Sequence, residues 1–421
     1  MSCDTTRTDR ENGSRFSGVT SSKHPLRILY ISEPWTHGAQ VRYTNVLLAL
    51  QQIGTVEVAM LGDGPRDTDC ELTAGVETKI AYSFQTRSRA NTGLISKLKF
   101  TFDPRADYPY AWAIVGEGRE RLNRCLKDFD LIWFFKQRAA DLFPNAVWPR
   151  SVVDIDDVQS TYERAALRVG GPLDRLQALR GMFIWRRRER LLADRFSVLT
   201  VCSEEDKDYL RRMGVRGPVH VIPNGFERVT AEPVRCPVTP GRIGFIGGFD
   251  HLPNRDGMTW FVRRCWPKVK RVAPETRLRV IGRGTDNYGE LGGPDLDQLG
   301  WLPDPSDEIK TWSAMVVPIR LGAGTRVKIA QGFSQKCPII STSFGAIGYG
   351  AVDGREMYLA DSPDAFSRAC IKAIREPEEA AQMAERAWIR FLDNWTWDAI
   401  RPRVWAAAEE CLRLNAHPVT V

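Results

Sequence analysis

The chain is 421 residues long, with 43% apolar residues, 26% charged residues and a net charge of +7. This length exceeds what one hydrophobic core usually supports, so we expect two domains, and the composition is that of a globular protein. The charge is modest and comes with no nucleic-acid-binding motif. We therefore expect no nucleic-acid partner, but rather anionic small molecules or an anionic membrane surface.

The nine cysteines and five histidines are scattered, without a C-x-x-C or H-x-x-x-H pattern. We therefore expect no disulfide framework, no metal site and a cytoplasmic location. Residues 1–24 are polar and lack the apolar segment of a signal peptide, which predicts a disordered start. No apolar run reaches the length of a membrane span.

The first half of the chain has the pattern of a doubly wound sheet. Residues 26–32 form an apolar run typical of a buried parallel strand, residues 39–52 have helical apolar spacing, and residues 56–61 form the next strand. Further strands are predicted at 131–135, 151–155, 197–201 and 219–222, and the longest helix at 173–195.

The segment 175–195 combines apolar residues with seven arginines. A basic amphipathic helix of this kind can lie on an anionic membrane, and peripheral contact with the inner face of a membrane is one interpretation. The alternative is a helix that packs one face on the sheet and leaves the other in water.

A proline-rich stretch at 227–241 has no period and is predicted to be a linker. The α/β pattern then restarts, which predicts a second Rossmann-like domain over residues 242–396 after a first one over residues 25–226. Its predicted strands are 242–246, 278–281, 315–319 and 339–341, its predicted helices are 257–273 and 326–335, and the tail from 377 onward is helical. Open α/β sheets bind ligands beyond the carboxyl ends of their strands, so we expect the binding residues in the loops there.

Three glycine loops follow strands of the second half: Gly247-Gly248, Gly282-Arg283-Gly284 and Gly322-Ala323-Gly324. None has the G-x-G-x-x-G form, and no acidic residue follows at the spacing of a ribose clamp. A nicotinamide dehydrogenase is therefore disfavoured. Three such loops on one edge of a sheet favour a phosphate-bearing ligand.

The third loop continues through Thr325 into a helix that carries Arg326 and Lys328 near its start. Free backbone N–H groups and the helix dipole attract anions at this end, whereas cations there are unfavourable on their own. A bound diphosphate would account for both cations, and Arg255, after the first loop, is a third candidate. The alternative is an ordinary strand–loop–helix connection with solvated basic residues.

Taken in order, the motifs of the chain resemble the retaining GT-B glycosyltransferases of family 4. The matching segments span nearly the whole chain after Leu26. In the first half they are WTHGAQVRYTNVLLAL, VVDIDDVQSTYER, VLTVCSEEDKDYL and VHVIPNGFE. In the second half they are IGFIGGFDHLPNRDGMTWFV, LRVIGRG, LGWLPD and GAGTRVKIAQGFSQKCPIISTSFGAIGY.

The resemblance implies an α/β GT-B fold, with two Rossmann-like domains facing across a cleft and a C-terminal helix (397–421) that returns to the first domain. It also implies a nucleotide-diphosphosugar donor in the second domain and a glycan or lipid-linked acceptor in the first. Transfer would proceed with retention and without a metal or another cofactor.

The resemblance also assigns residues. Arg326 and Lys328 would stabilise the leaving diphosphate, and Asp157 would contact the donor sugar or the acceptor. His37 and Gly38 would face the diphosphate from the first domain. The expected donor-binding residues are Gly247, Gly248, Arg255, Gly282, Gly284, Trp301, Leu302, Gly322, Gly324, Thr325 and Gln331. For Trp301, stacking along the nucleobase and a core or interdomain position both remain open.

The acids Asp154, Asp156 and Asp157 have a rival interpretation. A D-x-D at a strand end is the metal site of single-domain GT-A glycosyltransferases, in which carboxylates hold a divalent cation. The second Rossmann pattern argues against that class. Capping of the helix that begins near Ser160 is a further alternative for each acid.

Two positions depart from the family pattern. Gln331 stands where the family usually has the Glu that holds the ribose, and Ala323 replaces a second Glu. Gln331 lies one helical turn after Lys328, so it still faces the ligand. The departures keep open a catalytically weak or inactive GT-B protein that binds a sugar nucleotide or glycan.

Overall fold

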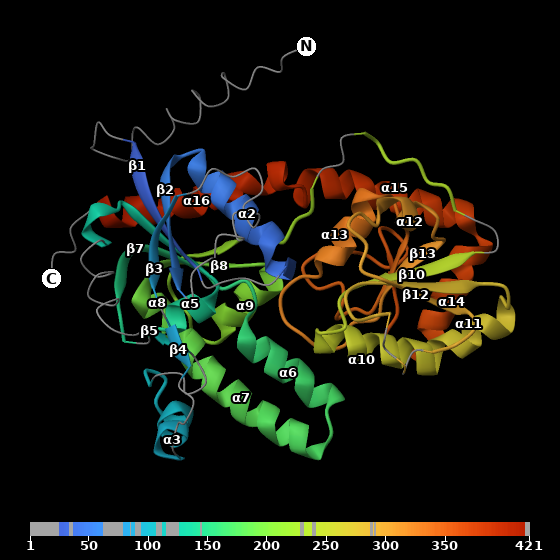
Figure 1. Ribbon diagram of the computed structural model, residues 1–421, viewed down its shortest axis with the longest axis horizontal. Coiled ribbons are helices and arrows are strands. Elements are labelled where there is room, and N and C mark those ends of the chain that lie inside the picture. Colours follow the sequence, from blue (N-terminus) through green and yellow to red (C-terminus); the bar gives the residue numbers. More distant parts are fainter. Residues whose placement is uncertain are drawn as a thin grey trace, which may run out of the picture. The chain divides into compact units, whose positions relative to one another are not determined.

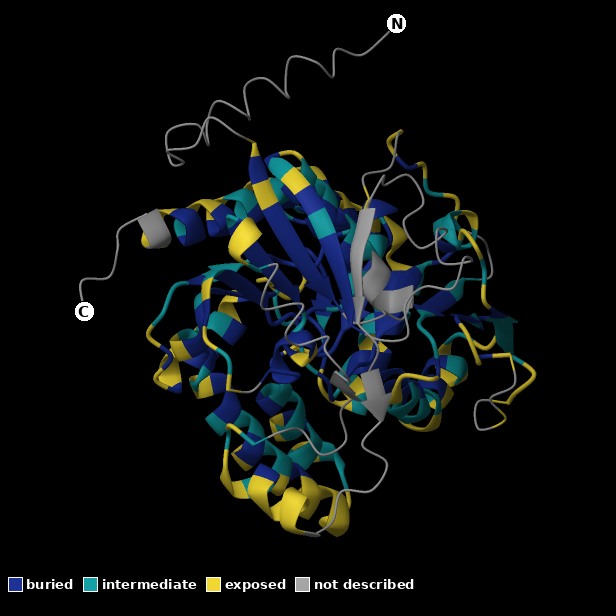
Figure 2. Cartoon of the chain, turned by 60° about the vertical axis from the view of Figure 1, so that its left-hand side comes forward, coloured by how far each residue is buried: buried dark blue, intermediate teal, exposed yellow. Residues whose placement is uncertain are grey.

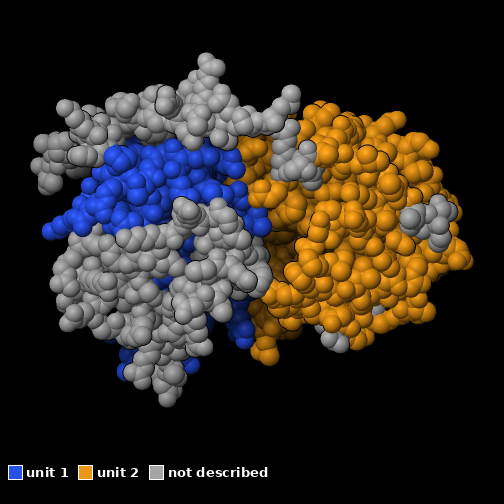
Figure 3. All heavy atoms as spheres, turned by 45° about the horizontal axis from the view of Figure 1, so that its top comes forward, with its two compact units in different colours: residues 1–160, 176–222, 400–421 blue, residues 161–175, 223–399 orange. Residues whose placement is uncertain are grey.

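The computed structural model describes residues 25–32, 37–61, 79–84, 86–88, 94–106, 112–114, 126–143, 145–227, 231–237, 241–286, 289 and 292–416. The predicted disordered start, residues 1–24, lies outside this part. Contacts divide the chain into two compact units (Figure 3). Unit 1 comprises Met1–Ser160, Leu176–Ile222 and Ile400–Val421, and unit 2 comprises Thr161–Arg175 and Pro223–Ala399.

Unit 1 is built on a seven-stranded parallel sheet in the order β3-β2-β1-β6-β7-β8-β9 (Figure 1). Its strands are β1 (Leu26–Ser32), β2 (Gly54–Leu61), β3 (Lys79–Phe84), β6 (Leu131–Phe135), β7 (Trp148–Asp154), β8 (Phe196–Val201) and β9 (Val219–Val221). All five residues of β6, Leu-Ile-Trp-Phe-Phe, are buried, as expected for a strand covered on both faces. A separate antiparallel pair joins β4 (Thr86–Ser88) to β5 (Trp112–Ile114).

The helices that lie wholly within unit 1 are α2 (His37–Gln51), α3 (Leu94–Phe102), the short η2 (Leu126–Asp128), α5 (Gln137–Asp141), α8 (Leu192–Arg195) and α9 (Glu204–Arg212). Most of α7 (Pro172–Arg190) and of α16 (Trp397–Ala416) also belongs to unit 1. Helix α6 (Gln159–Val169) and the start of α7 cross into unit 2. The helix predicted at 173–195 is therefore broken after Arg190. In α16, the Trp405 indole donates to the carbonyl of Ala49, 2.8 Å away, so this helix packs on α2. Figure 2 shows that the strands are mainly buried and that exposed residues gather on the helices.

Unit 2 is built on a six-stranded parallel sheet in the order β12-β11-β10-β13-β14-β15. Its strands are β10 (Arg242–Ile246), β11 (Arg277–Ile281), β12 (Leu296–Gly300), β13 (Ala314–Val317), β14 (Ile339–Ser341) and β15 (Tyr358–Leu359). The sequence predicted four of them and missed β12 and β15. Gly244 in β10 is needed for packing, since a Cβ there would lie 1.9 Å from Cε3 of the buried Trp312.

The helices of unit 2 are α10 (Leu252–Trp260), the π-helix η3 (Phe261–Cys265), α11 (Trp266–Val272), α12 (Ser306–Lys310), α13 (Val327–Ser334), α14 (Pro363–Arg375) and α15 (Pro377–Asn394). The helix predicted at 257–273 in fact begins at Leu252 and contains the π-turn. One core cluster includes Ile243 and Phe245 of β10, and another includes Met315 and Val317 of β13, so both faces of the sheet are covered.

The predicted linker is described at residues 231–237, where it is held by residues of unit 2. Cys236 N donates to the Lys310 carbonyl over 3.0 Å, and Arg235 donates to the Ile309 carbonyl over 2.6 Å. Among the described residues, no helix is both long and apolar enough to cross a membrane.

Candidate functional site

The carboxyl edge of the unit 2 sheet brings together the loops that carry the predicted donor residues. All strands of this sheet are parallel, so their carboxyl ends lie on one edge. The three glycine loops leave β10, β11 and β13 at this edge, and Trp301 and Leu302 follow β12.

The first two glycine loops are bonded to each other and to β12 through their backbones. Gly247 N donates to the Ile281 carbonyl and Gly282 N to the Gly300 carbonyl, each over 2.8 Å. A Cβ on Gly282 would lie 2.3 Å from the Gly247 carbonyl oxygen, which leaves no room for a side chain there. A Cβ on Gly247 would lie 2.7 Å from Nζ of Lys328, so this glycine makes room for the ammonium.

The third glycine loop leads into α13, whose N-cap is Arg326. Gly324 has φ of 65°, a conformation that favours glycine. The Arg326 guanidinium folds back over this loop and donates from Nη1 to the carbonyls of Ala323 and Gly324, both over 2.6 Å. It also lies 5.4 Å from the centre of the Phe344 ring. Arg326 is thus held at the start of α13, where an anion would be attracted.

Lys328, in the first turn of α13, has an amide and an aromatic ring as neighbours. Its ammonium donates to Oδ1 of Asn254 over 2.8 Å and lies 4.0 Å from the centre of the Phe245 ring. Among the described residues no carboxylate pairs with it. Desolvation, followed by the charge of Arg326, holds the pKa of Lys328 well below its usual value. An anion bound here would favour the charged form of Lys328 and so offset both the desolvation and the repulsion from Arg326.

The electrostatic field at this edge also acts on His251, the N-cap residue of α10. Burial lowers the pKa of His251, and the charges of Lys328 and Arg326 lower it further. Arg255, one turn into α10, donates to the Phe249 carbonyl over 3.0 Å. The edge therefore concentrates positive charge at helix N-termini, an arrangement suited to a diphosphate.

Two polar side chains of the predicted donor set are available for a ligand. The Thr325 hydroxyl is buried and has no hydrogen-bond partner within the described part of the chain. The half-buried Gln331 amide forms no hydrogen bond with any described residue, and its backbone carbonyl accepts from the Ser334 hydroxyl. Both residues lie at or within α13, close in sequence to Arg326 and Lys328.

Trp301 and Leu302 lie in the loop between β12 and α12. Trp301 is 61% exposed, so the core interpretation of this tryptophan is wrong within unit 2. Leu302 is half-buried and packs against the core.

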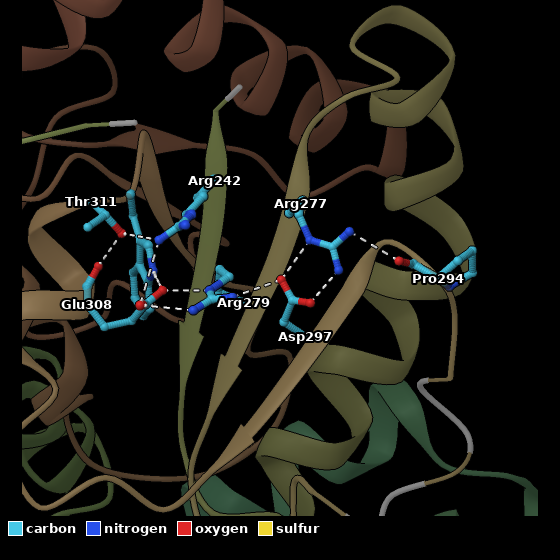
Figure 4. A network of polar contacts seen from close by, with 8 residues as sticks. Arg242, Arg277, Arg279, Pro294, Asp297, Glu308 and Thr311 are labelled. Carbon is cyan, nitrogen blue, oxygen red and sulfur yellow. Dashed lines mark hydrogen bonds and ion pairs between the residues drawn. The ribbon is translucent and has the colours of Figure 1, made fainter. Parts of the chain in front are cut away.

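The loop that carries Trp301 is fixed by the ion-pair network drawn in Figure 4. Glu308 on α12 accepts from Nε and Nη2 of Arg279, over 2.6 and 3.0 Å, and from the Trp312 indole over 2.9 Å. Arg279 Nη1 also donates to Oδ2 of Asp297 over 2.9 Å. Because Arg279 lies on β11 and Asp297 on β12, the network ties α12 to the two strands beside the loop.

Two of the three acids at the end of β7, Asp154 and Asp156, are paired with cations. Asp154, at the end of β7, accepts from Nε and Nη2 of Arg42, over 2.9 and 2.7 Å. Asp156 pairs with Nζ of Lys136 over 3.0 Å and with Nε of Arg42 over 3.7 Å. Although burial alone would raise it, the charges of Lys136 and Arg42 lower the pKa of Asp156. These pairs argue against the D-x-D metal interpretation, since both acids are committed to cations.

Asp157 is exposed in the same loop, between β7 and α6. Asp156 in this loop has φ of 57°, and Lys136, directly after the neighbouring β6, has φ of 69°. Non-glycine residues in this conformation cost of order 1–3 kcal/mol and gather at functional sites. Helix α2 begins at His37, but the side chain of His37 and the surroundings of Gly38 lie outside what the structure describes.

The sequence did not single out Asn254, Phe245 or Lys136 as site residues. Asn254 holds Lys328 and also donates to the Gly248 carbonyl over 2.8 Å, so it joins the first glycine loop to α13. The one sequence feature that could have pointed to Asn254 is its position in HLPNRDG, directly after the first glycine loop. Among the described residues, no group of three or more His, Cys, Asp or Glu is arranged to hold a metal ion.

Residues 240–376 match the model of a family described as glycosyl transferases group 1. The matched range contains β10 to β14 and all the donor residues placed at the carboxyl edge of unit 2. A protein from Klebsiella pneumoniae, described as an uncharacterized 44.6 kDa protein in the cps region, is 22% identical over 161 residues. The match covers 36% of this chain and 42% of that relative, so less than half of the curated relative's length is spanned.

Solved structures match nearly the whole chain. HepE from Anabaena, crystallised with UDP and glucose, has a TM-score of 0.61 at 13% identity, and the match covers 90% of this chain and 98% of HepE. Sucrose-phosphate synthase from Thermosynechococcus elongatus has a TM-score of 0.62 at 14% identity, again covering 90% and 98%. The chain has the GT-B fold. In GT-B terms, the two parallel sheets are the two Rossmann-like halves that the sequence predicted.

Proposed function

We propose that this GT-B protein transfers a sugar from a nucleotide-diphosphosugar to a hydroxyl acceptor, with retention of configuration and without a metal. The observation that carries the proposal is the Lys328 ammonium, desolvated and without a carboxylate partner among the described residues, next to Arg326 at the start of α13. The family match over 240–376 and the HepE structure with UDP and glucose support a nucleotide-sugar donor. They make UDP-glucose the first donor to test.

The chemistry follows from these charges. The bond between the anomeric carbon and the diphosphate oxygen breaks, and negative charge grows on the leaving diphosphate. We assign the stabilisation of that charge to Arg326, Lys328 and the N–H groups at Gly324 and Thr325, which precede or begin α13. The acceptor hydroxyl attacks from the side of the leaving group, and the leaving phosphate takes its proton, so configuration is retained. Asp157 is proposed to contact the donor sugar or the acceptor.

The remaining donor residues are assigned the roles that the resemblance to family 4 implies. Gln331 hydrogen-bonds the ribose hydroxyls, and Trp301 and Leu302 lie along the nucleobase. Arg255 and the three glycine loops line the diphosphate, and His37 and Gly38 approach it from the first half of the chain. The acceptor is a glycan or a lipid-linked glycan, and we place the protein in the cytoplasm, peripheral to the inner face of the membrane.

The test is a nucleotide-release assay across a panel of nucleotide sugars, after a thermal-shift screen that selects the donor, since a bound donor stabilises the fold by mass action. Lys328→Met is expected to lower kcat/KM by about 100- to 1000-fold, the size found when a charge-stabilising donor is removed. Lys268→Met is the matched control, because Lys268 is a half-buried lysine on α11 that pairs with Asp364. Equal activity of Lys328→Met and wild type would refute the proposed role.

A second candidate function is a catalytically weak or inactive GT-B protein that binds a nucleotide sugar or glycan. Ala323 and Gln331, at positions where a carboxylate was expected, favour it. It predicts a thermal shift with the donor and no nucleotide release with any acceptor. Nucleotide release by the wild type at a higher rate than by the Lys328→Met variant would exclude this second function.

A further inference from the structure

Two helices of unit 1 expose large apolar side chains. On α3 these are Ile95 (72% exposed), Leu98 (49%) and Phe102 (62%). On the part of α7 within unit 1 they are Leu176 (66%), Leu179 (49%) and Phe183 (47%). Fifteen large apolar side chains are exposed in the described part of the chain. Seven of them are on these two helices, and six of those seven lie within unit 1. Such a concentration marks an interaction surface.

The six residues form one stripe on each helix. Positions 95, 98 and 102 and positions 176, 179 and 183 both follow the i, i+3, i+7 spacing of a single helical face. Other apolar residues of the same helices are buried, namely Phe100 on α3 and Ala178 and Ile184 on α7. Each helix therefore has a core side and, separately, an apolar stripe whose members are about half exposed or more. On α7 the Arg187 guanidinium lies 5.2 Å from the centre of the Phe183 ring.

The two stripes lie on adjoining helices, because α3 packs against α7 (Figure 1). Arg180 Nη2 on α7 donates to the Thr101 hydroxyl on α3 over 2.7 Å. The Arg188 guanidinium lies 4.2 Å from the centre of the Phe100 ring, and the Trp185 ring meets Phe100 edge-on with centres 6.4 Å apart. We refer to the six exposed apolar residues and the basic residues of these helices as the α3–α7 surface.

The charges of the α3–α7 surface have one sign. Helix α3 carries Lys97 and Lys99, both exposed, and no acidic residue. From Leu176 onward α7 carries several arginines, and Glu189 is its one carboxylate and is fully buried. An apolar stripe flanked by cations complements a surface of anionic headgroups above acyl chains.

We propose that the α3–α7 surface docks on an anionic lipid bilayer. The apolar stripes enter the boundary between headgroups and acyl chains, and the lysines and arginines meet the lipid phosphates. This inference goes beyond the proposed transfer reaction and does not depend on it, because membrane binding needs no donor. Compared with the sequence interpretation of residues 175–195, it adds α3 as a second, adjoining element and names the residues that enter the lipid.

The test is flotation of the full chain with vesicles of phosphatidylcholine, with and without phosphatidylglycerol. Wild type is expected to float only with the anionic vesicles, and less as salt is raised. Replacing Leu98 and Phe102 together by serine removes two apolar side chains from the lipid and is expected to lower the partition coefficient about tenfold or more. Lys97→Gln with Lys99→Gln is expected to lower it on the order of 30-fold, since each cation near the surface contributes about fivefold.

The matched control replaces Val352 and Ile389 by serine, two apolar residues of unit 2 that are 54% and 55% exposed. It should float like wild type. All replaced side chains are exposed, so the variants should keep the wild-type Tm. Each variant should also show the same rise in Tm with a nucleotide sugar as wild type, which checks that the donor site is intact. Failure of membrane binding can therefore be distinguished from failure of the proposed transfer reaction.

Three results would overturn the proposal. Wild type could fail to float with anionic vesicles, or the Leu98/Phe102 variant could float as well as wild type. The third result is that neither protein binds vesicles, while sedimentation shows that wild type is a dimer and the Leu98/Phe102 variant is a monomer. The α3–α7 surface would then be an interface between copies of this chain.

Discussion

Replacing Lys328 by methionine should separate ligand binding from folding. Methionine keeps an unbranched side chain over the Phe245 ring and removes only the ammonium, which donates to Asn254 and has no carboxylate partner among the described residues. A hydrogen bond to a charged group contributes about 1.5–3 kcal/mol. We therefore expect the variant to bind a nucleotide sugar roughly 10- to 150-fold more weakly.

The same variant should fold nearly as well as wild type. Loss of the charged bond to Asn254 costs about 1.5–3 kcal/mol, and removal of a desolvated cation offsets most of that cost. The free energy of unfolding should therefore fall by no more than about 1 kcal/mol. A buried ion pair would behave differently, because loss of one partner costs about 3–5 kcal/mol.

The pH dependence gives a second signature of Lys328. Its pKa is lowered in the folded protein, so between that value and the unfolded pKa of about 10.4 the unfolded chain binds more protons. Stability of the wild type should rise with pH through this window, and the rise should be smaller in Lys328→Met. Nucleotide-sugar affinity should change in the opposite direction, falling as the ammonium loses its proton.

Denaturant unfolding and isothermal calorimetry at several pH values measure these effects, with Lys268→Met as control. A nucleotide sugar is the right probe because its diphosphate is doubly esterified and does not titrate near neutral pH, unlike a terminal phosphate. Unchanged affinity in Lys328→Met, or a loss of several kcal/mol in folding stability, would refute the reasoning.

Three further predictions concern neighbouring residues. Gln331→Glu should tighten nucleotide binding about fivefold in calorimetry, because a carboxylate makes stronger hydrogen bonds to ribose hydroxyls; unchanged or weaker binding would show that Gln331 does not touch the ribose. Two arginine partners lower the pKa of Asp297 to about 2, so its contribution to stability is full above about pH 4 and is lost as pH falls toward 2. Asp297→Asn should therefore lose less stability than wild type on acidification in denaturant titrations, and an equal loss would contradict this. Gly282→Ala should cost about 1–3 kcal/mol, because its Cβ would overlap the Gly247 carbonyl, whereas Gly289→Ala, with open space, should cost little; equal effects would contradict the packing argument.

Much of the unit 2 edge could be predicted from sequence because its signals are local. A glycine loop between an apolar run and a helix places Arg326 and Lys328 at a helix start, and the structure has α13 beginning one residue later, at Val327. The partners of Lys328 could not be predicted in this way. Asn254 and Phe245 reach it from other elements, and only the packing of β10, α10 and α13 brings them together.

Other features could not be predicted from the sequence, for different reasons. Strand β12, Leu-Asp-Gln-Leu-Gly, has no β-branched or aromatic residue, so its composition carries no strand signal. Lys136 and Asp156 both have positive φ although neither is a glycine, and their residue types do not predict this conformation. The apolar stripe of α3 has the same spacing as a core stripe, and only the fold shows that it is exposed.

The most direct test is a crystal structure with the nucleotide sugar that gives the largest thermal shift. We predict diphosphate oxygens within hydrogen-bonding distance of Nζ of Lys328 and of the Arg326 guanidinium, at the start of α13. A nucleotide sugar bound with its diphosphate away from both side chains would contradict the account.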